Sequence, residues 1–290
     1  MLYNKPITDI IEDRFSCRSY LETPIEEEKR QQLEDFMSAT QTGPFGTRVR
    51  FELVAATEQD QNTLKGLGTY GFIKNPVGFI VSAVTDADKG LEDLGYLMEH
   101  IVLFATDIGL GTCWLGGTFT RSSFARRISA RNGESVPIVT SVGYMANGPQ
   151  DDPIRQRIGG AHRKPWEEMF FDGQFGAPIS HDVAGAYRVP LEMVRLGPSA
   201  SNKQPWRIIK DGNAWHFYVQ RTPGYRSGWM ARLARVADMQ RIDMGIAMSH
   251  FELAANELGL TGKWQVREPN VEKPDQETEY TVSWVGDRGV

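Results

Sequence analysis

Three polar residues alternate along the segment RFSCRSY, at positions Arg14, Ser16 and Arg18. In an extended backbone, side chains two residues apart point to the same side, so these three would share one face. Two guanidinium groups and a hydroxyl on one face make a site for an anion, and the forked guanidinium suits phosphate. The alternative is a solvated turn with ordinary surface charges, which the residues alone favour slightly.

Cys17 lies between the two arginines, which would lower the pKa of its thiol and make it reactive. A single cysteine without a local partner is more often an inert filler. The other cysteine, Cys113, is far away in the sequence and forms no CxxC pair, so a disulfide framework is not expected.

Two further segments carry groups that could bind a ligand. Arg163 and Lys164 form a second basic pair, ahead of a proline. The loop GPSASNKQPW, Gly197–Trp206, combines small residues that let backbone N–H groups approach a ligand with the amides of Asn202 and Gln204. A plain turn before a strand explains this loop about equally well.

The segment GTCWLGGTF, Gly111–Phe119, offers small residues beside Trp114, a wall for a flat ligand. Its Gly-x-Gly pattern follows a helix and not a strand, so the dinucleotide-binding fingerprint fails in context. Four aromatic residues are candidates for the same pocket, each at least as well explained as core: Phe45, Tyr70, Phe72 and Trp114.

These segments surround a stretch that occurs twice. Asp93–Trp114 matches Asp243–Trp264 without a gap at nine positions, where composition alone predicts about one or two matches. The matching pairs are Asp93/Asp243, Gly95/Gly245, Met98/Met248, His100/His250, Leu103/Leu253, Ala105/Ala255, Gly109/Gly259, Leu110/Leu260 and Trp114/Trp264. Apolar residues at three- and four-residue steps predict one long buried helix in each copy. The two histidines are interpreted as satisfied core residues and not as metal ligands, because no second ligand stands at metal-binding spacing.

The remaining pattern predicts an α+β fold with a mostly antiparallel or mixed sheet. Helices are expected at 7–13, 24–38, 121–131 and 189–196, and strands at 51–56, 78–84, 137–143, 207–210, 215–219 and 280–285. We predict a first half at residues 1–171, a linker at 172–186 and an abbreviated second half at 187–290. Two halves with the same element order should pack about a pseudo-twofold axis.

Composition excludes several classes of function. The net charge of −5 argues against a broad nucleic-acid interface. No apolar run is long enough to cross a membrane, and the first residues show no signal-peptide core, so a cytoplasmic protein is expected.

Together these segments resemble the nitroreductase family of flavoproteins. RFSCRSY resembles the family's RxSxR phosphate motif, AHRKPWEE its C-terminal phosphate segment and GPSASNKQPW its PSxxNxQPW loop. DLGYLMEHIVLFATDIGLGTCWLGGTF is similar to its central helix and following loop. The first half has TGPFGTRVR where the PSxxNxQPW loop would be expected, and the second half lacks both phosphate segments. Each half therefore keeps what the other has lost, which implies a fused pseudo-dimer with one composite site.

The resemblance implies that the cofactor is FMN. Arg14, Phe15, Ser16, Arg18 and Arg163 would bind its phosphate. The residues implied around its ribityl chain and ring are Lys74, Pro198, Ser199, Ser201, Asn202 and Gln204, together with the backbone of Cys113, Trp114, Leu115, Gly116 and Gly117 near the reactive edge of the ring.

The implied activity is electron transfer from NADH or NADPH, through FMN, to an electron-poor acceptor such as a nitroaromatic or a quinone. No side chain is required as an acid or base, so no catalytic residue and no metal is expected. A fused chain of this kind could be monomeric. The alternative is a flavin-binding or purely structural protein of the same fold without turnover.

Overall fold

The computed structural model describes residues 3–60, 62–225 and 237–287. Residues 1–2 and 61 of the predicted first half and residues 226–236 and 288–290 of the predicted second half therefore lie outside the described residues. Each half contains the same unit of two strands, a long helix and two strands. In the first half these are β1 (Val49–Ala55), β2 (Gly78–Thr85), α3 (Gly90–Asp107), β3 (Gly111–Leu115) and β5 (Val139–Gly143). In the second they are β7 (Trp206–Asp211), β8 (Ala214–Gln220), α9 (Met239–Glu257), β9 (Gly262–Gln265) and β10 (Thr278–Gly286).

The strands form two separate sheets with equivalent orders. The first runs β1-β2-β5-β3 and is antiparallel throughout, with the short β4 (Glu134–Ser135) beside β2. The second runs β7-β8-β10-β9 in the same antiparallel manner. It is extended by a parallel strand, β6 (Phe170–Asp172), on the outer side of β7. The α+β class with mixed pairing is therefore confirmed.

The remaining elements are short or lie outside the repeat. They are α1 (Ile7–Asp13), α2 (Glu27–Ala39), α4 (Arg121–Arg127), α5 (Pro153–Arg157), α6 (His181–Ala184) and α7 (Arg188–Leu196), with short 3-10 turns between them. Pro24 precedes α2 instead of standing in its first turn, because the chain stays extended through Glu26 while Ile25 is buried in the core. The segment Gly111–Leu115, expected as a loop, is the edge strand β3.

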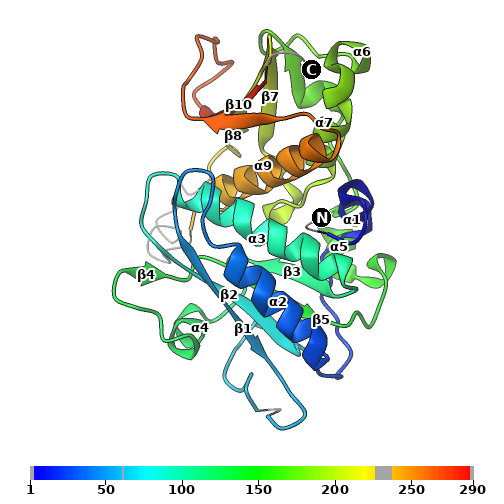
Figure 1. Ribbon diagram of the computed structural model, residues 1–290, viewed down its shortest axis with the longest axis vertical. Coiled ribbons are helices and arrows are strands. Elements are labelled where there is room, and N and C mark those ends of the chain that lie inside the picture. The colour runs from blue at the N-terminus through cyan, green and yellow to red at the C-terminus, as the bar shows by residue number, and fades with distance from the viewer. Residues whose placement is uncertain (1–2, 61, 226–236, 288–290) are drawn as a thin grey trace.

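The two long helices form the centre of the molecule, between the two sheets (Figure 1). Both end in the same hydrogen-bonded cap, which uses the repeated glycine in the left-handed conformation. At the end of α3, Leu110 N donates to Ala105 O and Gly109 has φ +82°. At the end of α9, Leu260 N donates to Ala255 O and Gly259 has φ +73°.

α3 and α9 cross at the repeated glycines. A Cβ added to Gly95 would lie 2.2 Å from Ile242 O, and one added to Gly245 would lie 2.1 Å from Glu92 O. Positions 92 and 242 are themselves repeat partners, so the contact is the same in both directions, as in a symmetric dimer. The two halves therefore pack about a pseudo-twofold axis that passes through this crossing.

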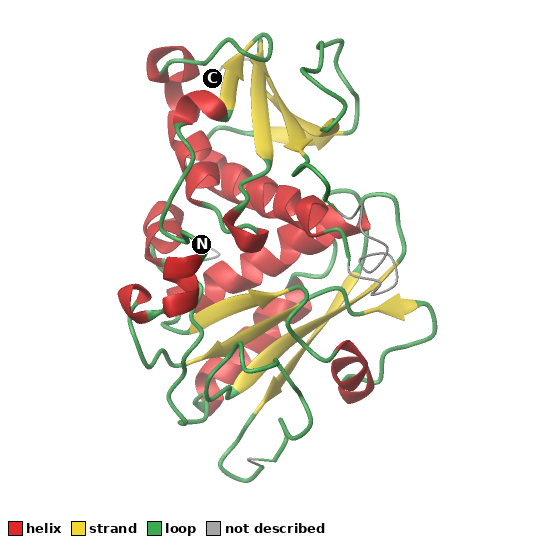
Figure 2. Ribbon diagram, turned by 180° about the vertical axis from the view of Figure 1, so that it is seen from behind, coloured by secondary structure: helices red, strands yellow, loops and turns green. Residues whose placement is uncertain are grey.

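The halves are also joined by β6. Phe170 and Phe171 fall in the predicted first half, yet they pair with Ile208 and Ile209 of β7 and are buried on the second sheet. The strand β6 therefore belongs to the second sheet. The division of the chain at residue 171 stays a prediction. Figure 2 shows the two sheets in opposite halves of the molecule, with the long helices α3 and α9 between them. No helix among the described residues is both long and apolar enough to cross a membrane.

Candidate functional site

A cavity of about 410 Å³ lies between the two halves. It is lined from the first half by residues 14–18, the end of β3 and the α5 region, and from the second half by the loop after α7 and the start of α9. The predicted sites that line it are Arg14, Ser16, Arg18, Trp114, Gly116, Gly117, Arg163, Pro198, Ser199, Ser201 and Asn202. The amino-terminal basic segment and the amide-rich loop, which are far apart in sequence, therefore meet at one site.

The segment Arg14–Tyr20 is extended, as the alternation predicts. Ser16 forms a parallel bridge with Thr112, and Cys17 N donates to Thr112 O at 2.8 Å. Arg14, Ser16 and Arg18 face the cavity, whereas Cys17 is buried in the core beside Tyr20. Burial raises the pKa of the Cys17 thiol, so the lowered value expected from its arginine neighbours is wrong.

Within the described ranges, four guanidinium groups line the cavity, and the fourth, Arg155, was not predicted. Arg18 pairs with Asp152, whereas the acidic partner of Arg14 among the described residues is Glu99, with Arg14 Nε 3.7 Å from Glu99 Oε1. Burial, and then the charges of the other arginines, lowers the pKa of Arg163 to about 10. Burial also lowers the pKa of Arg14 and of Arg155. A bound anion would relieve this repulsion.

The Nε atoms of three of these arginines are buried and have no hydrogen-bond partner within the described ranges; they belong to Arg14, Arg18 and Arg163. Buried donors are nearly always satisfied in native proteins, so unpaired donors that gather around a cavity point to a ligand. The acceptor that fits several guanidiniums at once is a phosphate or carboxylate.

The strand β3 presents one residue to the cavity. Trp114 lines it and donates from Nε1 to Glu99 Oε2 at 3.0 Å. Cys113 and Leu115 point the other way into the core and do not line it. Gly116 and Gly117 follow the end of the strand, and a Cβ on Gly116 would lie 2.1 Å from Met239 Sδ. The glycine there leaves room for the Met239 side chain, from the start of α9, to pack against the backbone after β3.

The loop after α7 supplies the opposite wall. Asn202 donates from Nδ2 to Gly159 O at 2.6 Å and accepts from Arg163 Nη1 at 3.2 Å, which ties the two halves together. Gln204 is buried and does not line the cavity. Its amide oxygen accepts from Lys164 N at 2.8 Å, so it supports the segment that carries Arg163. Ser201, Asn202 and Gln204 all have positive φ, a strained conformation that is common in functional loops.

Two predicted residues lie beside the main cavity. Phe15 and Lys74 line a neighbouring hollow of about 70 Å³, which shares Ser16 and Arg18 with the large cavity. Phe72 lines both, whereas Tyr70 is 75% exposed and Phe45 packs against the second-half core.

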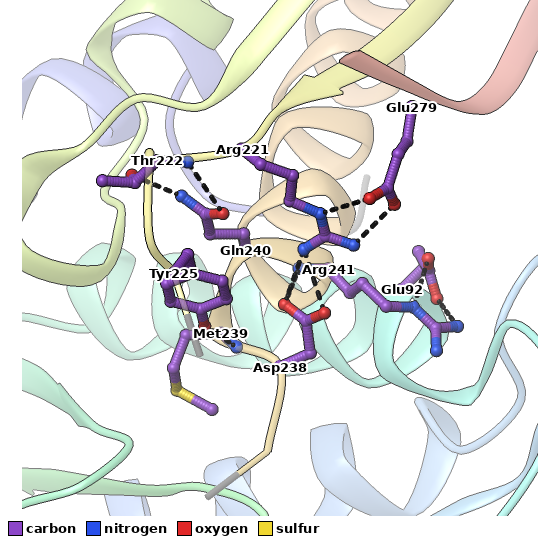
Figure 3. Close-up of polar contacts among 9 residues, drawn as sticks. All are labelled: Glu92, Arg221, Thr222, Tyr225, Asp238, Met239, Gln240, Arg241 and Glu279. Carbon is purple, nitrogen blue, oxygen red and sulfur yellow. Dashed lines mark hydrogen bonds and ion pairs between the residues drawn. The ribbon is translucent and has the colours of Figure 1, made fainter. Parts of the chain in front are cut away.

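The start of α9 is fixed by a polar cluster next to the cavity (Figure 3). Arg221 donates to both oxygens of Asp238 at 2.8 and 2.9 Å and also pairs with Glu279. Arg241 of α9 pairs with Glu92 of α3 at 2.6 Å, across the boundary between the halves. Such two-point contacts fix geometry as well as charge, so Met239 is held where it borders the cavity.

The family model described as "Putative TM nitroreductase" matches residues 6–255 of the chain. The chain belongs to this nitroreductase family. Among solved structures, the "putative nitroreductase" of Thermotoga maritima is 20% identical, with a TM-score of 0.62 over 98% of this chain and 94% of that one. The nitroreductase fold predicted from the motifs is therefore confirmed. No curated protein sequence matches the chain.

Shorter nitroreductase structures align with about half of this family member. A nitroreductase family protein of Clostridium difficile 630 is 20% identical, with a TM-score of 0.42 over 56% of this chain and 94% of that one. A nitroreductase with bound FMN from Desulfitobacterium hafniense is 17% identical, with a TM-score of 0.40 over 50% of this chain and 91% of that one.

Sequence reasoning missed much of the lining of this nitroreductase. The missed residues are Thr118, Ile138, Ile154, Arg155, Ile158, Gly160, Ala200, Met239, Ile242, Asp243 and Ile246. Arg155 had a signal: Asp152 followed by Pro153 marks a helix start, and Asp152 accepts from Ile154 N and Arg155 N. The apolar residues had none, because a residue that borders a cavity reads as core.

Asp243 is the acidic residue among these missed lining residues, and the duplication gives it a repeat partner, Asp93. Its Oδ1 accepts from Ala200 N at 2.9 Å, and its Oδ2 is buried without a partner among the residues the structure describes. Its repeat partner Asp93 accepts from Phe45 N and Thr47 N, one with each oxygen. Burial raises the pKa of Asp243 well above its usual value, which favours a proton on the carboxyl beside the cavity.

This proton gives a pH-dependent stability. The folded protein keeps a proton on Asp243 that the unfolded chain releases at lower pH. Stability is therefore lost as the pH rises from the ordinary aspartate pKa to the raised one. Asp243→Asn removes that titration and keeps the hydrogen bond to Ala200. Within that window, we expect the free energy of unfolding of the variant to rise relative to that of the wild type by up to about 1.4 kcal/mol per pH unit.

Urea unfolding of ligand-free protein between about pH 5 and pH 8 measures the difference. Asp93→Asn is the matched control. Burial also raises the pKa of Asp93, but two backbone N–H groups oppose it, so a smaller change with pH is expected. Parallel stability curves for wild type and Asp243→Asn would contradict the prediction.

Proposed function

We propose that the cavity binds FMN and that the protein is an FMN-dependent oxidoreductase of nitroreductase type. Its electron donor would be NADH or NADPH, and its acceptor an electron-poor compound such as a nitroaromatic or a quinone. The observation that carries the proposal is the basic end of the cavity, where the Nε atoms of Arg14, Arg18 and Arg163 are buried and have no partner among the described residues. Family membership supports the chemistry, and FMN is present in a solved nitroreductase of the same fold.

The charges at this end fit a phosphate monoester. The Arg18 guanidinium is balanced by Asp152, whereas the guanidiniums of Arg155 and Arg163 have no acidic side chain bonded to them within the described ranges. With Arg14, the described residues give this end of the cavity more positive than negative charge, even when Glu99 and Asp152 are both counted. A phosphate monoester carries about −1.5 to −2 at neutral pH, which this excess would neutralise.

The chain's own residues would bind and orient the cofactor. The guanidiniums and the Ser16 hydroxyl would hold the phosphate, and Ser199, Ser201 and Asn202 would contact the remainder from the other half. Trp114 and the backbone at Gly116 would form the wall along a flat ring. FMN, when bound, supplies electron transfer between donor and acceptor, and the protein supplies position and electrostatics. We assign no catalytic side chain.

One site per chain is proposed. The loop Thr40–Arg48 stands where the first half would need its copy of Gly197–Trp206, and both oxygens of Asp93 are used in holding it. The second half carries no counterpart of the arginine segment at 14–18. The symmetry-related position therefore lacks such a phosphate clamp among the residues that the structure describes.

The test is to identify the chromophore released by heat from the purified protein and to measure its ratio to chain. We expect FMN at about one per chain, bleached under anaerobic conditions by NADH or NADPH and reoxidised by a nitroaromatic. Two FMN per chain would contradict the single composite site. A bound flavin that no reduced nicotinamide bleaches would favour a flavin-binding protein without turnover.

A further inference from the structure

A buried carboxylate connects the basic end of the cavity to the second half. Glu99 of α3 is fully buried, and three groups contact it. His250 Nε2 of α9 lies 2.8 Å from Oε1, and Trp114 Nε1 donates to Oε2 at 3.0 Å. Arg14 Nε is 3.7 Å from Oε1, which is within ion-pair range and beyond a hydrogen bond.

His250 is held between two acceptors. Its Nδ1 lies 2.8 Å from Met193 O, a carbonyl that can only accept. Nδ1 therefore carries a hydrogen, and the contact between Nε2 and Glu99 needs one more proton, on either partner. In both arrangements the His250–Glu99 pair is neutral as a unit. His250 thus balances the charge of Glu99, and the positive charge of Arg14 is left without a full counter-charge from Glu99.

We propose that His250 is a positioning residue for the cofactor phosphate. By taking up the charge of Glu99, it leaves the Arg14 guanidinium available to the cavity. Without His250, Arg14 would be the nearest cation to a buried carboxylate, and the two would pair at the expense of the ligand. The inference rests on the proposed binding of FMN, and it gives the second half a role at the phosphate end of the site.

The duplication supplies an internal comparison. Glu99 and Ser249 are repeat partners, as are His250 and His100. At the symmetry-related place, Ser249 Oγ and His100 Nε2 are both buried without a partner in the described part of the chain. Burial, and then the nearby charge of His250, lowers the pKa of His100 to about 3, so that ring stays neutral. Glu99, the acidic member of these pairs, is therefore in the same half as Arg14 and Arg18.

The test compares FMN with riboflavin, which lacks the phosphate, by fluorescence titration of the apoprotein. For His250→Gln we expect FMN to bind about tenfold more weakly and riboflavin to change less than about twofold. His100→Gln, the matched control, should leave the ratio of the two affinities unchanged. Equal losses for both flavins would mean that His250 serves only the fold, and would overturn the proposal.

A second substitution separates charge from packing. If His250 acts by neutralising Glu99, the double variant Glu99→Gln/His250→Gln should recover the FMN affinity lost in His250→Gln. Glu99→Gln alone should bind FMN as tightly as the wild type or more tightly, which tests the idea even if His250→Gln does not fold. An FMN affinity lowered about tenfold or more in Glu99→Gln, with riboflavin unaffected, would overturn it. A wild-type apoprotein with no preference for FMN over riboflavin would instead refute the phosphate assignment itself.

Discussion

Arg14→Met is expected to weaken FMN binding by about 100-fold or more, because charge-assisted hydrogen bonds to a buried phosphate contribute about 1.5–3 kcal/mol each. Arg14 is buried, lines the cavity and has no hydrogen-bond partner for Nε among the described residues. Methionine keeps most of the apolar stem and removes the charge. The measurement is the dissociation constant of FMN from the apoprotein, with riboflavin titrated in parallel.

Arg18→Met should have a smaller effect on FMN affinity than Arg14→Met, because one Arg18 nitrogen is already bound to Asp152. The matched control is Arg157→Met, since Arg157 is exposed on the same short helix as Arg155 and does not line the cavity. An FMN affinity in Arg14→Met within about threefold of that of Arg157→Met would show that the phosphate binds elsewhere.

The sequence predicted the lining of the cavity where a residue's type or its alternation along an extended segment indicates which way its side chain points. Arg14, Ser16 and Arg18 line the cavity because the extended backbone places alternate side chains on one side. The same alternation explains why Cys113 and Leu115 do not: β3 turns them into the core. The role implied for Cys113 and Leu115 is one of their backbone, and a side chain turned into the core leaves that role open.

What the sequence could not predict depends on contacts between distant segments. Gln204 has the residue type of a ligand-binding amide, yet it is buried and holds the segment that carries Arg163. The residues of β6, Phe170–Asp172, do not indicate by their type or pattern that this strand joins the second sheet and not the first. The long helices were predictable from their periodicity and repeat. Their crossing at glycine was not, because it depends on how the two helices pack against each other.

Gly245→Val is expected to lower the free energy of unfolding by about 3 kcal/mol or more, since overpacking costs about 1–3 kcal/mol even where side chains can move. Here the added atoms would meet backbone: a Cβ at residue 245 lies 2.1 Å from Glu92 O and 2.6 Å from Tyr96 N. Both are main-chain atoms of a buried helix, so relief requires α3 and α9 to separate. The measurement is urea unfolding followed by tryptophan fluorescence.

Separation of these helices would also open the site, because Ile242, Asp243 and Ile246 of α9 line the cavity. Gly245→Val should therefore lose FMN affinity although residue 245 does not line the cavity, and Gly95→Val should behave alike because the crossing is symmetric. Asn256→Val, on an exposed position of α9, controls for a β-branched residue in the helix and should change stability by less than about 0.5 kcal/mol. If Gly245→Val were as stable as Asn256→Val, the close crossing would not be what joins the two halves.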